Sequence, residues 1–175
     1  GYENGFEFTC IATSNKAFGA PVVEAIIPFL KKVNITVKPQ MLEGAALSDR
    51  IFKTGDFDAY IWSVESGPDP LQALRRWHSE NPRSGGNLVS YNNPEFDKLL
   101  EAAAEERDNA KKTKLLQQAD AIFKADAPLW FFNYNKAIIA AHPWVHGIKP
   151  VAVEHMFQDF TSVWVEESSP RANAK

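Results

Sequence analysis

The stretch "FDAYIWSVESGPDP", Phe57 to Pro70, decides the fold class. Residues 57–64 form an almost continuous apolar run, which is typical of a strand buried on both faces of a parallel sheet. A loop rich in Gly, Pro and acidic residues ends the run. Asp69 followed by Pro70 is a good helix start, a capping residue and then a first helical residue. The stretch therefore predicts a strand, an acidic loop at its carboxyl end, and a helix.

The residues before this stretch predict alternating strands and helices. "FEFTCIAT" (6–13) and "ITVKPQML" (35–42) have the composition of strands. Apolar residues at helical spacing lie between them, from Val22 to Val33, and a shorter helix around Leu47 to Phe52 stops at Gly55. Strand, helix, strand, helix, strand, helix is the order of an α/β domain with parallel crossovers.

The residues after the stretch predict a helical pair followed by further strands. A helix that Asn93 caps and a second helix around 115–123 are expected to form an antiparallel pair over the sheet. "APLWFFNY" (127–134) and "KAIIAAH" (136–142) predict two joined strands, and "FTSVWVEE" (160–167) predicts one more. The aromatic run "WFFNY" is interpreted most simply as a core strand.

Composition bounds the class of protein. The chain has 175 residues, of which 45% are hydrophobic and 23% charged, as in an ordinary soluble domain with a proper core. The net charge of −3 provides no basic field for nucleic acid or for a membrane surface. The lone Cys10 excludes an internal disulfide and a Cys-rich zinc site. Because the chain opens on Gly1 without a signal peptide, we expect a mature or excised piece of something longer.

No pattern indicates catalysis, a metal site or a cofactor. The chain has no GxSxG, P-loop, GxGxxG or HExxH pattern, and "SGG" (84–86) is too short to count as a phosphate loop. "HPWVH" suggests a metal site only weakly, since Pro143 breaks its spacing and no Cys is near. The histidines are therefore expected at surfaces or interfaces: His78, His142, His146 and His155.

The acidic loop leaves two interpretations open. Glu65 follows the carboxyl end of a predicted strand, where ligands meet an open α/β sheet, and it offers a charge for a cationic group. The simpler interpretation is that Glu65 is a solvated turn carboxylate, because turn loops commonly carry acids. Asp69 is interpreted as a helix cap. Trp62 and Trp77 lie beside the loop in sequence and are candidate ligand contacts.

An ordered set of segments resembles the motifs of one known protein family. "GYENGFEF" resembles the Gly-Tyr-x-x-Gly-Phe segment that leads into their second lobe. "LKKVNITVKPQ" is similar to their helix and Gly-Ile-x-Val step, with Asn34 at the glycine. "KTGDFDAYIWSVESGPDP" and "VSYNNPEFDKLLEAA" resemble their Gly-Asp-Phe-Asp and Tyr-Ser-Asn-Pro-Glu-Phe-Asp segments. "AIFKADAPLWFFNY" and "HPWVHGIKP" follow in the family's order. Over nearly its whole length, the chain thus resembles the peptide/nickel-type solute-binding proteins of ABC importers, solute-binding family 5.

The resemblance implies half of a two-lobed receptor. Family members close two lobes on a ligand like a hinge, and this chain resembles the C-terminal lobe. The implied fold is a type II periplasmic-binding-protein-like lobe, α/β, with a mixed, mostly parallel sheet flanked by helices. Residues 1–145 are expected to form the ligand-binding lobe, and 146–175 an exit segment and tail that cross back to the first lobe. The implied location is the periplasm or the cell surface.

The resemblance also implies a binding site at Trp62, Ser63, Val64 and Glu65. In peptide-binding members the backbone after this Trp pairs with an extended peptide, and an acid three residues later holds its terminal amine. Glu65 stands here where Asp is more usual. The implied function is capture of a peptide or similar amine-bearing solute and its delivery to an ABC permease, with membrane contact only through the transporter. The alternatives are another cargo such as a metal chelate or sugar, a sensor or partner-binding module, and, at low weight, a hydrolase.

Overall fold

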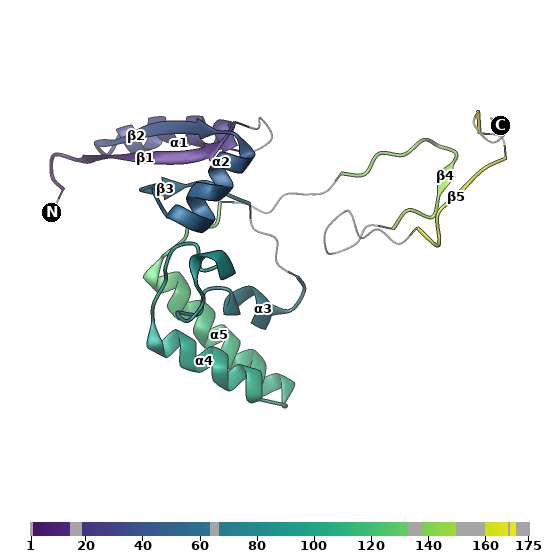
Figure 1. The fold of residues 1–175 in the computed structure, drawn as a ribbon. Coiled ribbons are helices and arrows are strands. Elements are labelled where there is room, and N and C mark those ends of the chain that lie inside the picture. Colours follow the sequence, from purple (N-terminus) through teal and green to yellow (C-terminus); the bar gives the residue numbers. More distant parts are fainter. Residues whose placement is uncertain are drawn as a thin grey trace.

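The structure, a computed structural model, describes residues 2–14, 19–63, 67–132, 138–149, 160–167 and 169–170. Figure 1 shows its elements as an α/β part, a helical part and a separate pair of short strands. In chain order they are β1 (Phe6–Thr13), α1 (Gly19–Lys31), β2 (Ile35–Leu42), α2 (Gly44–Asp49), the π-helix η1 (Arg50–Thr54), β3 (Ala59–Tyr60), α3 (Pro70–Arg75), the 3-10 helix η2 (Arg83–Gly85), α4 (Pro94–Glu105), α5 (Asn109–Asp126), β4 (Val145–His146) and β5 (Trp164–Val165).

The main sheet is parallel, as the alternation of strands and helices predicts. Its strand order is β2-β1-β3, and β1 pairs with both neighbours in parallel. Pro39 lies opposite Cys10 in this register. Proline has no N–H to donate and is tolerated on an edge strand, which is where β2 lies. The α/β fold with a mostly parallel sheet is confirmed.

The two faces of β1 contribute to two different cores. Cys10 and Ala12 are buried on one face, in a cluster with Val23 of α1. Ile11 points to the opposite face and is buried in a cluster with Leu47 of α2. This alternation follows from the two-residue period of a strand. Helices therefore cover the sheet on both sides.

The turn between α1 and β2 is left-handed at Asn34. Its φ is +60°, a region that glycine enters freely and asparagine tolerates better than most residues. The motif that this segment resembles has glycine at this position, a residue that suits a positive φ. Gly5 lies close by: a Cβ on Gly5 would be 1.7 Å from the backbone oxygen of Asn34. Gly5 thus cannot carry a side chain without moving this turn.

Capping residues begin the helices where the sequence predicts. Asp69 accepts a 2.9 Å hydrogen bond from the backbone N–H of Leu71 at the start of α3. Asn93 accepts from two backbone N–H groups at the start of α4, and Asp108 accepts from one at the start of α5. Each satisfies donors that the first turn of a helix leaves unpaired. The predicted caps at Asp69 and Asn93 are confirmed.

The helical pair packs beside the sheet and not over it. In Figure 1, α4 and α5 lie below η1 and β3, whereas α2 contacts β1 directly. Their shared core is aromatic: the ring of Phe123 lies 5.5 Å from Phe96 and 5.7 Å from Trp77. The prediction of a pair over the sheet was wrong because α2 and η1 already occupy that face. Trp77 is only 4% exposed, so the interpretation of Trp77 as a ligand contact was also wrong.

The strand predicted over residues 57–64 is much shorter in the structure. Only Ala59–Tyr60 pair with β1, followed by a bond from the N–H of Ile61 to the oxygen of Ile11. β3 is half-buried, and not buried on both faces as the sequence predicted. The reason is its position, since β3 is an edge of the three-stranded sheet among the described residues. Val64 lies outside the described residues.

The two strands predicted at 127–134 and 136–142 are absent from their described parts. Residues 127–132 and 138–142 form no strand, and the remaining residues of the two predictions lie outside the described chain. Trp130 is 72% exposed and Phe131 and Phe132 are exposed as well, so the described part of "WFFNY" is not a core strand. A strand is stable only with a paired neighbour. Within the described residues no such neighbour pairs with this segment.

The last described elements form a small antiparallel pair. β4 and β5 pair Val145 with Val165 and His146 with Trp164, and Figure 1 shows them apart from the α/β part. The strand predicted at 160–167 is therefore present but only two residues long. Gly147, at φ +79°, lies against this pair: a Cβ there would be 1.8 Å from the backbone oxygen of Ser162. No helix of the described chain has the length and apolar character needed to cross a membrane.

Candidate functional site

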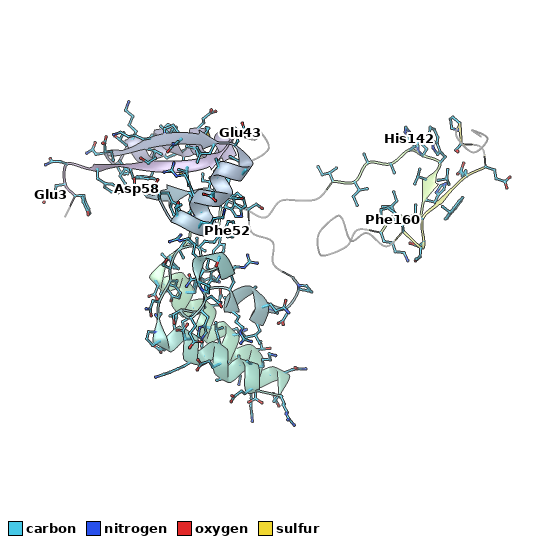
Figure 2. All side chains as sticks on the ribbon, in the orientation of Figure 1. Glu3, Glu43, Phe52, Asp58, His142 and Phe160 are labelled. Atoms are coloured by element: carbon cyan, nitrogen blue, oxygen red, sulfur yellow. The ribbon has the colours of Figure 1, made fainter. Side chains whose placement is uncertain are left out.

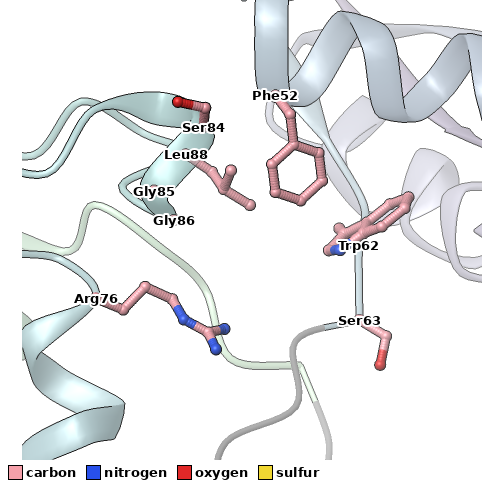
Figure 3. A pocket seen from close by; sticks show the side chains of 8 residues that line it. All are labelled: Phe52, Trp62, Ser63, Arg76, Ser84, Gly85, Gly86 and Leu88. Carbon is pink, nitrogen blue, oxygen red and sulfur yellow. The ribbon is translucent and has the colours of Figure 1, made fainter.

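A pocket lies between the end of β3 and the loop that contains η2. Its volume is about 280 Å³. Figure 3 shows aromatic side chains on one side and the glycine turn and an arginine on the other. The lining residues are Phe52, Trp62, Ser63, Arg76, Ser84, Gly85, Gly86 and Leu88.

The position of Trp62 follows from strand alternation. Ala59 and Ile61 pack with the cluster on the α1 side of the sheet, and Tyr60 and Trp62 pack with the cluster on the opposite side. Trp62 thereby meets Phe52 of η1, with ring centroids 5.8 Å apart and planes at 78°. This edge-to-face arrangement is one that aromatic pairs prefer. The indole is held at the carboxyl end of the parallel sheet, where ligands of open α/β sheets bind.

Arg76 faces the aromatic pair across the pocket. It follows the last residue of α3, and its side chain lies along Gly86, where a Cβ would come within 2.8 Å of Arg76 Cγ. Gly86 also has a φ of +115°, a region that strains residues with side chains. Figure 3 shows the guanidinium pointing toward the space in front of Trp62 and Ser63. Arg76 is the one charged side chain among the described residues that line the pocket.

Polar contacts hold the η2 loop in place. The guanidinium of Arg83 donates to the backbone oxygen of Leu88 and, over 3.1 Å, to Ser90 Oγ. The side chain of buried Asn87 accepts from the N–H of Tyr91 and donates to its backbone oxygen, each over 2.9 Å. These contacts hold the loop that forms this wall of the pocket.

Two of the four predicted site residues lie at this pocket. Trp62 and Ser63 line it, and Val64 and Glu65 lie outside the described residues. The sequence interpretation missed Phe52 and Arg76. Phe52 appeared only as an apolar residue of a short helix, and no pattern distinguishes Arg76 from its exposed neighbour Arg75.

The described histidines take part in local contacts. Figure 2 shows the region around His142 apart from the helical part. His78 Nε2 lies 3.4 Å from Glu101 Oε1 in the helical part. The ring of His142 stacks on Trp144 at 4.4 Å, and His146 stacks on Trp164 and contacts Glu166 Oε1 at 2.6 Å. His155 lies outside the described residues. In the part of the chain that the structure describes, no group of three or more His, Cys, Asp or Glu is arranged to hold a metal ion.

The thiol of Cys10 offers no reactive group. Cys10 is buried between β1 and α1. Burial raises the pKa of the thiol from 9.0 to about 11, because desolvation disfavours the thiolate. Since the thiolate is the nucleophile, this side chain is a packing residue at neutral pH.

Comparison with known proteins identifies the family. No family model matches the chain. It is 29% identical to the oligopeptide-binding protein AppA of Bacillus subtilis over 82% of the chain and 26% of AppA. It is 35% identical to the "Probable D,D-dipeptide-binding periplasmic protein DdpA" of Escherichia coli K12, over 73% of the chain and 25% of DdpA. The structure of the ABC transporter-associated periplasmic binding protein DppA of Helicobacter pylori, in complex with a peptide, matches 95% of the chain and 32% of DppA, with a TM-score of 0.77 and 26% identity.

The chain belongs to the solute-binding proteins of the peptide-binding type. The family resemblance in the sequence is therefore confirmed, and so is the periplasmic-binding-protein fold class. The chain spans about a quarter of the length of the curated relatives it matches. AppA, DdpA and DppA are all binding proteins by name. For a solute-binding protein, the pocket at Trp62 is a candidate part of the surface that meets solute.

Proposed function

We propose that the chain forms one wall of the cleft of a receptor that captures a peptide or a similar amine-bearing solute. In this proposal the receptor works in the periplasm or at the cell surface and delivers the solute to the permease of an ABC importer. The observation that carries the proposal is the position of Trp62 and Ser63. They line the pocket directly after β3, at the carboxyl end of a parallel sheet.

The proposed peptide contacts continue along the chain from this pocket. Backbone groups of Ser63 and Val64 would pair with an extended peptide, a mode in which main-chain hydrogen bonds provide affinity for many sequences. The carboxylate of Glu65 would bind the terminal amine of the solute. A charge-assisted bond of this kind is strong when the cleft excludes water. Val64 and Glu65 lie outside the described residues, so this role rests on the family pattern.

The proposed lobe boundaries are 1–145 for the ligand-binding lobe and 146–175 for the segment that crosses to the other lobe. Support comes from large apolar side chains that the described chain leaves in solvent near this boundary. Trp130, Ile138 and Phe160 are all more than two-thirds exposed. Several large apolar side chains exposed in one region are expected where another part of the protein packs. We propose that the rest of the receptor covers it.

The test of this function is binding by the full-length protein of a free-amine peptide and of its N-acetylated twin. We expect calorimetry to show binding of the free-amine peptide and much weaker binding of the acetylated one. Glu65→Gln should lower affinity for the free amine roughly 30- to 5000-fold, since it leaves an ammonium unpaired in a desolvated cleft.

The two twins separate the possible outcomes of this experiment. Equal loss for both peptides on Glu65→Gln would indicate a change of shape and not an amine contact. If Glu65→Gln lowers affinity for neither peptide, Glu65 is a solvated turn acid and not a ligand contact. Failure of the wild-type protein to bind any peptide of the series would remove the peptide-receptor proposal itself.

A further inference from the structure

The pocket beside the proposed peptide contacts is too small for a whole peptide. Its volume of about 280 Å³ is at the lower limit of pockets that bind small molecules. It therefore suits one side chain or one terminus of a longer solute. Because Trp62 and Ser63 belong both to its lining and to the proposed peptide contacts, a solute bound along that backbone passes its opening.

The chemistry of the lining is apolar on one side and cationic on the other. Phe52 and Trp62 present aromatic carbon, and Arg76 presents a guanidinium. A guanidinium has five N–H donors in a planar fork, so it can hold a protein group and the two oxygens of a ligand carboxylate at once. The second arginine nearby, Arg83, donates to Leu88 and Ser90 in the loop itself and does not line the pocket.

The backbone on which Arg76 rests is shaped for this side chain. Gly86 admits the stem of Arg76 where a side chain would collide with Cγ, and its positive φ keeps the loop folded back against the arginine. A fixed stem lowers the entropy that the guanidinium loses when it binds a ligand. The arginine is thus presented from a rigid support.

We propose that Arg76 binds a carboxylate of the solute, either the terminal one or that of an acidic side chain, while Phe52 and Trp62 contact the adjoining apolar atoms. This inference rests on the proposed peptide-receptor function. Together with an amine held by Glu65, it narrows the solute to a zwitterionic one that has an anionic group within reach of Arg76. Solutes without that group bind less tightly.

The experiment uses matched tripeptides and the full-length protein. The probes are Ala-Glu-Phe, Ala-Gln-Phe and the C-terminal amide of each, titrated calorimetrically into wild type and variants. For wild type we expect removal of at least one of the two carboxylates to lower affinity about 30-fold. Arg76→Gln should weaken binding of the probes that have the recognised carboxylate, by a factor similar to that carboxylate's removal in wild type. Its affinity for the probes that lack this carboxylate should equal that of wild type. Arg76→Lys should recover only part of the affinity, since an ammonium lacks the planar fork.

Arg75→Gln is the matched control, because it removes the same charge from the exposed neighbouring residue that does not line the pocket. It should leave all affinities within about twofold, and thermal unfolding should show all variants folded. If Arg76→Gln weakens all four probes equally, with or without the carboxylate whose removal lowers wild-type affinity, or if it weakens none of them, the role of Arg76 is overturned while the peptide receptor stays intact. Absence of binding by wild type to every probe would overturn both.

Discussion

The ring of Phe52 meets the indole of Trp62 edge to face, and this contact joins η1 to the end of β3 at the pocket. The two residues are ten positions apart in the sequence. The orientation of Phe52 follows from the apolar face of a helix, and that of Trp62 from the alternation of side chains along a strand. Their contact therefore depends on how η1 packs beneath the sheet. Trp62 is consequently oriented by a residue that has no sequence signature of a binding site.

Replacing Phe52 by Ala is expected to lower the free energy of unfolding by about 1–3 kcal/mol. This is less than the cost of removing a fully buried phenylalanine, because Phe52 is only half-buried. Chemical denaturation measures the loss, and the emission of Trp62 should shift as its edge contact disappears. Phe29→Ala, on the exposed side of α1, is the control and should cost less than about 1 kcal/mol. Equal costs at both sites would contradict a supporting role for Phe52.

Asn93→Ala is expected to destabilise the protein by about 1–2 kcal/mol. The Asn93 side chain accepts hydrogen bonds of 3.0 and 3.2 Å from the N–H groups of Glu95 and Phe96, and also donates to Asp126. Asn93→Asp should recover part of the loss, since it keeps the acceptor for the helix start but places a second carboxylate beside Asp126. Thermal unfolding of the two variants compares these effects. A more stable Asp variant than wild type would show that the Asp126 contact contributes nothing.

Tyr60→Phe is expected to leave stability unchanged or raise it by about 1 kcal/mol. The hydroxyl of Tyr60 is buried and has no hydrogen-bond partner among the described residues. Burial also raises the pKa of this phenol from 10.0 to about 12. Removing a buried, unpaired polar atom relieves its desolvation cost. Denaturant midpoints of the two proteins provide the test, and a clear loss on substitution would reveal a partner that the hydroxyl binds in solution.

The hydrogen bond between Tyr91 and Asp126 is expected to make stability depend on pH at both acid and alkaline pH. Tyr91 donates a 2.5 Å hydrogen bond to Asp126, which holds the pKa of Asp126 below its usual 3.8. This contribution is present above pH 3.8 and disappears as the pH falls through the lower folded pKa. Burial and then the Asp126 bond raise the pKa of Tyr91 above 10.0, so its contribution is present below pH 10 and is lost as the pH rises beyond it.

Tyr91→Phe tests both arms of this dependence. We expect a lower Tm at neutral pH and a flatter curve of Tm against pH below 3.8 and above 10, because the variant lacks the phenol and its Asp126 keeps only the bond from Asn93. Tyr2→Phe, an exposed tyrosine at the start of the chain, is the control and should leave the curve unchanged. A Tyr91→Phe curve parallel to that of wild type would exclude this pair as the source.

The sequence by itself determined the local elements and the family. Strand composition and alternation correctly predicted β1 and β2, and side chains that accept from free N–H groups marked the starts of α3 and α4. Such features depend on residues a few positions apart, so a local pattern contains the necessary information. The ordered motifs also identified the solute-binding proteins. The family pattern names Trp62 and Ser63 as ligand contacts; both line the pocket, and their contact with a solute stays a prediction.

Only the tertiary structure decided how long the remaining strands are and what surrounds Trp62. Residues 57–64 and 127–132 have strand composition, yet a strand forms only where a neighbour pairs with it, and β3 is an edge of the described sheet. Arg76 resembles Arg75 in sequence, and it becomes a pocket residue because the positive φ of Gly86 folds the η2 loop against its stem. Contacts between distant segments depend on packing that no single segment encodes, and that is the physical reason the second wall of the pocket was not predictable.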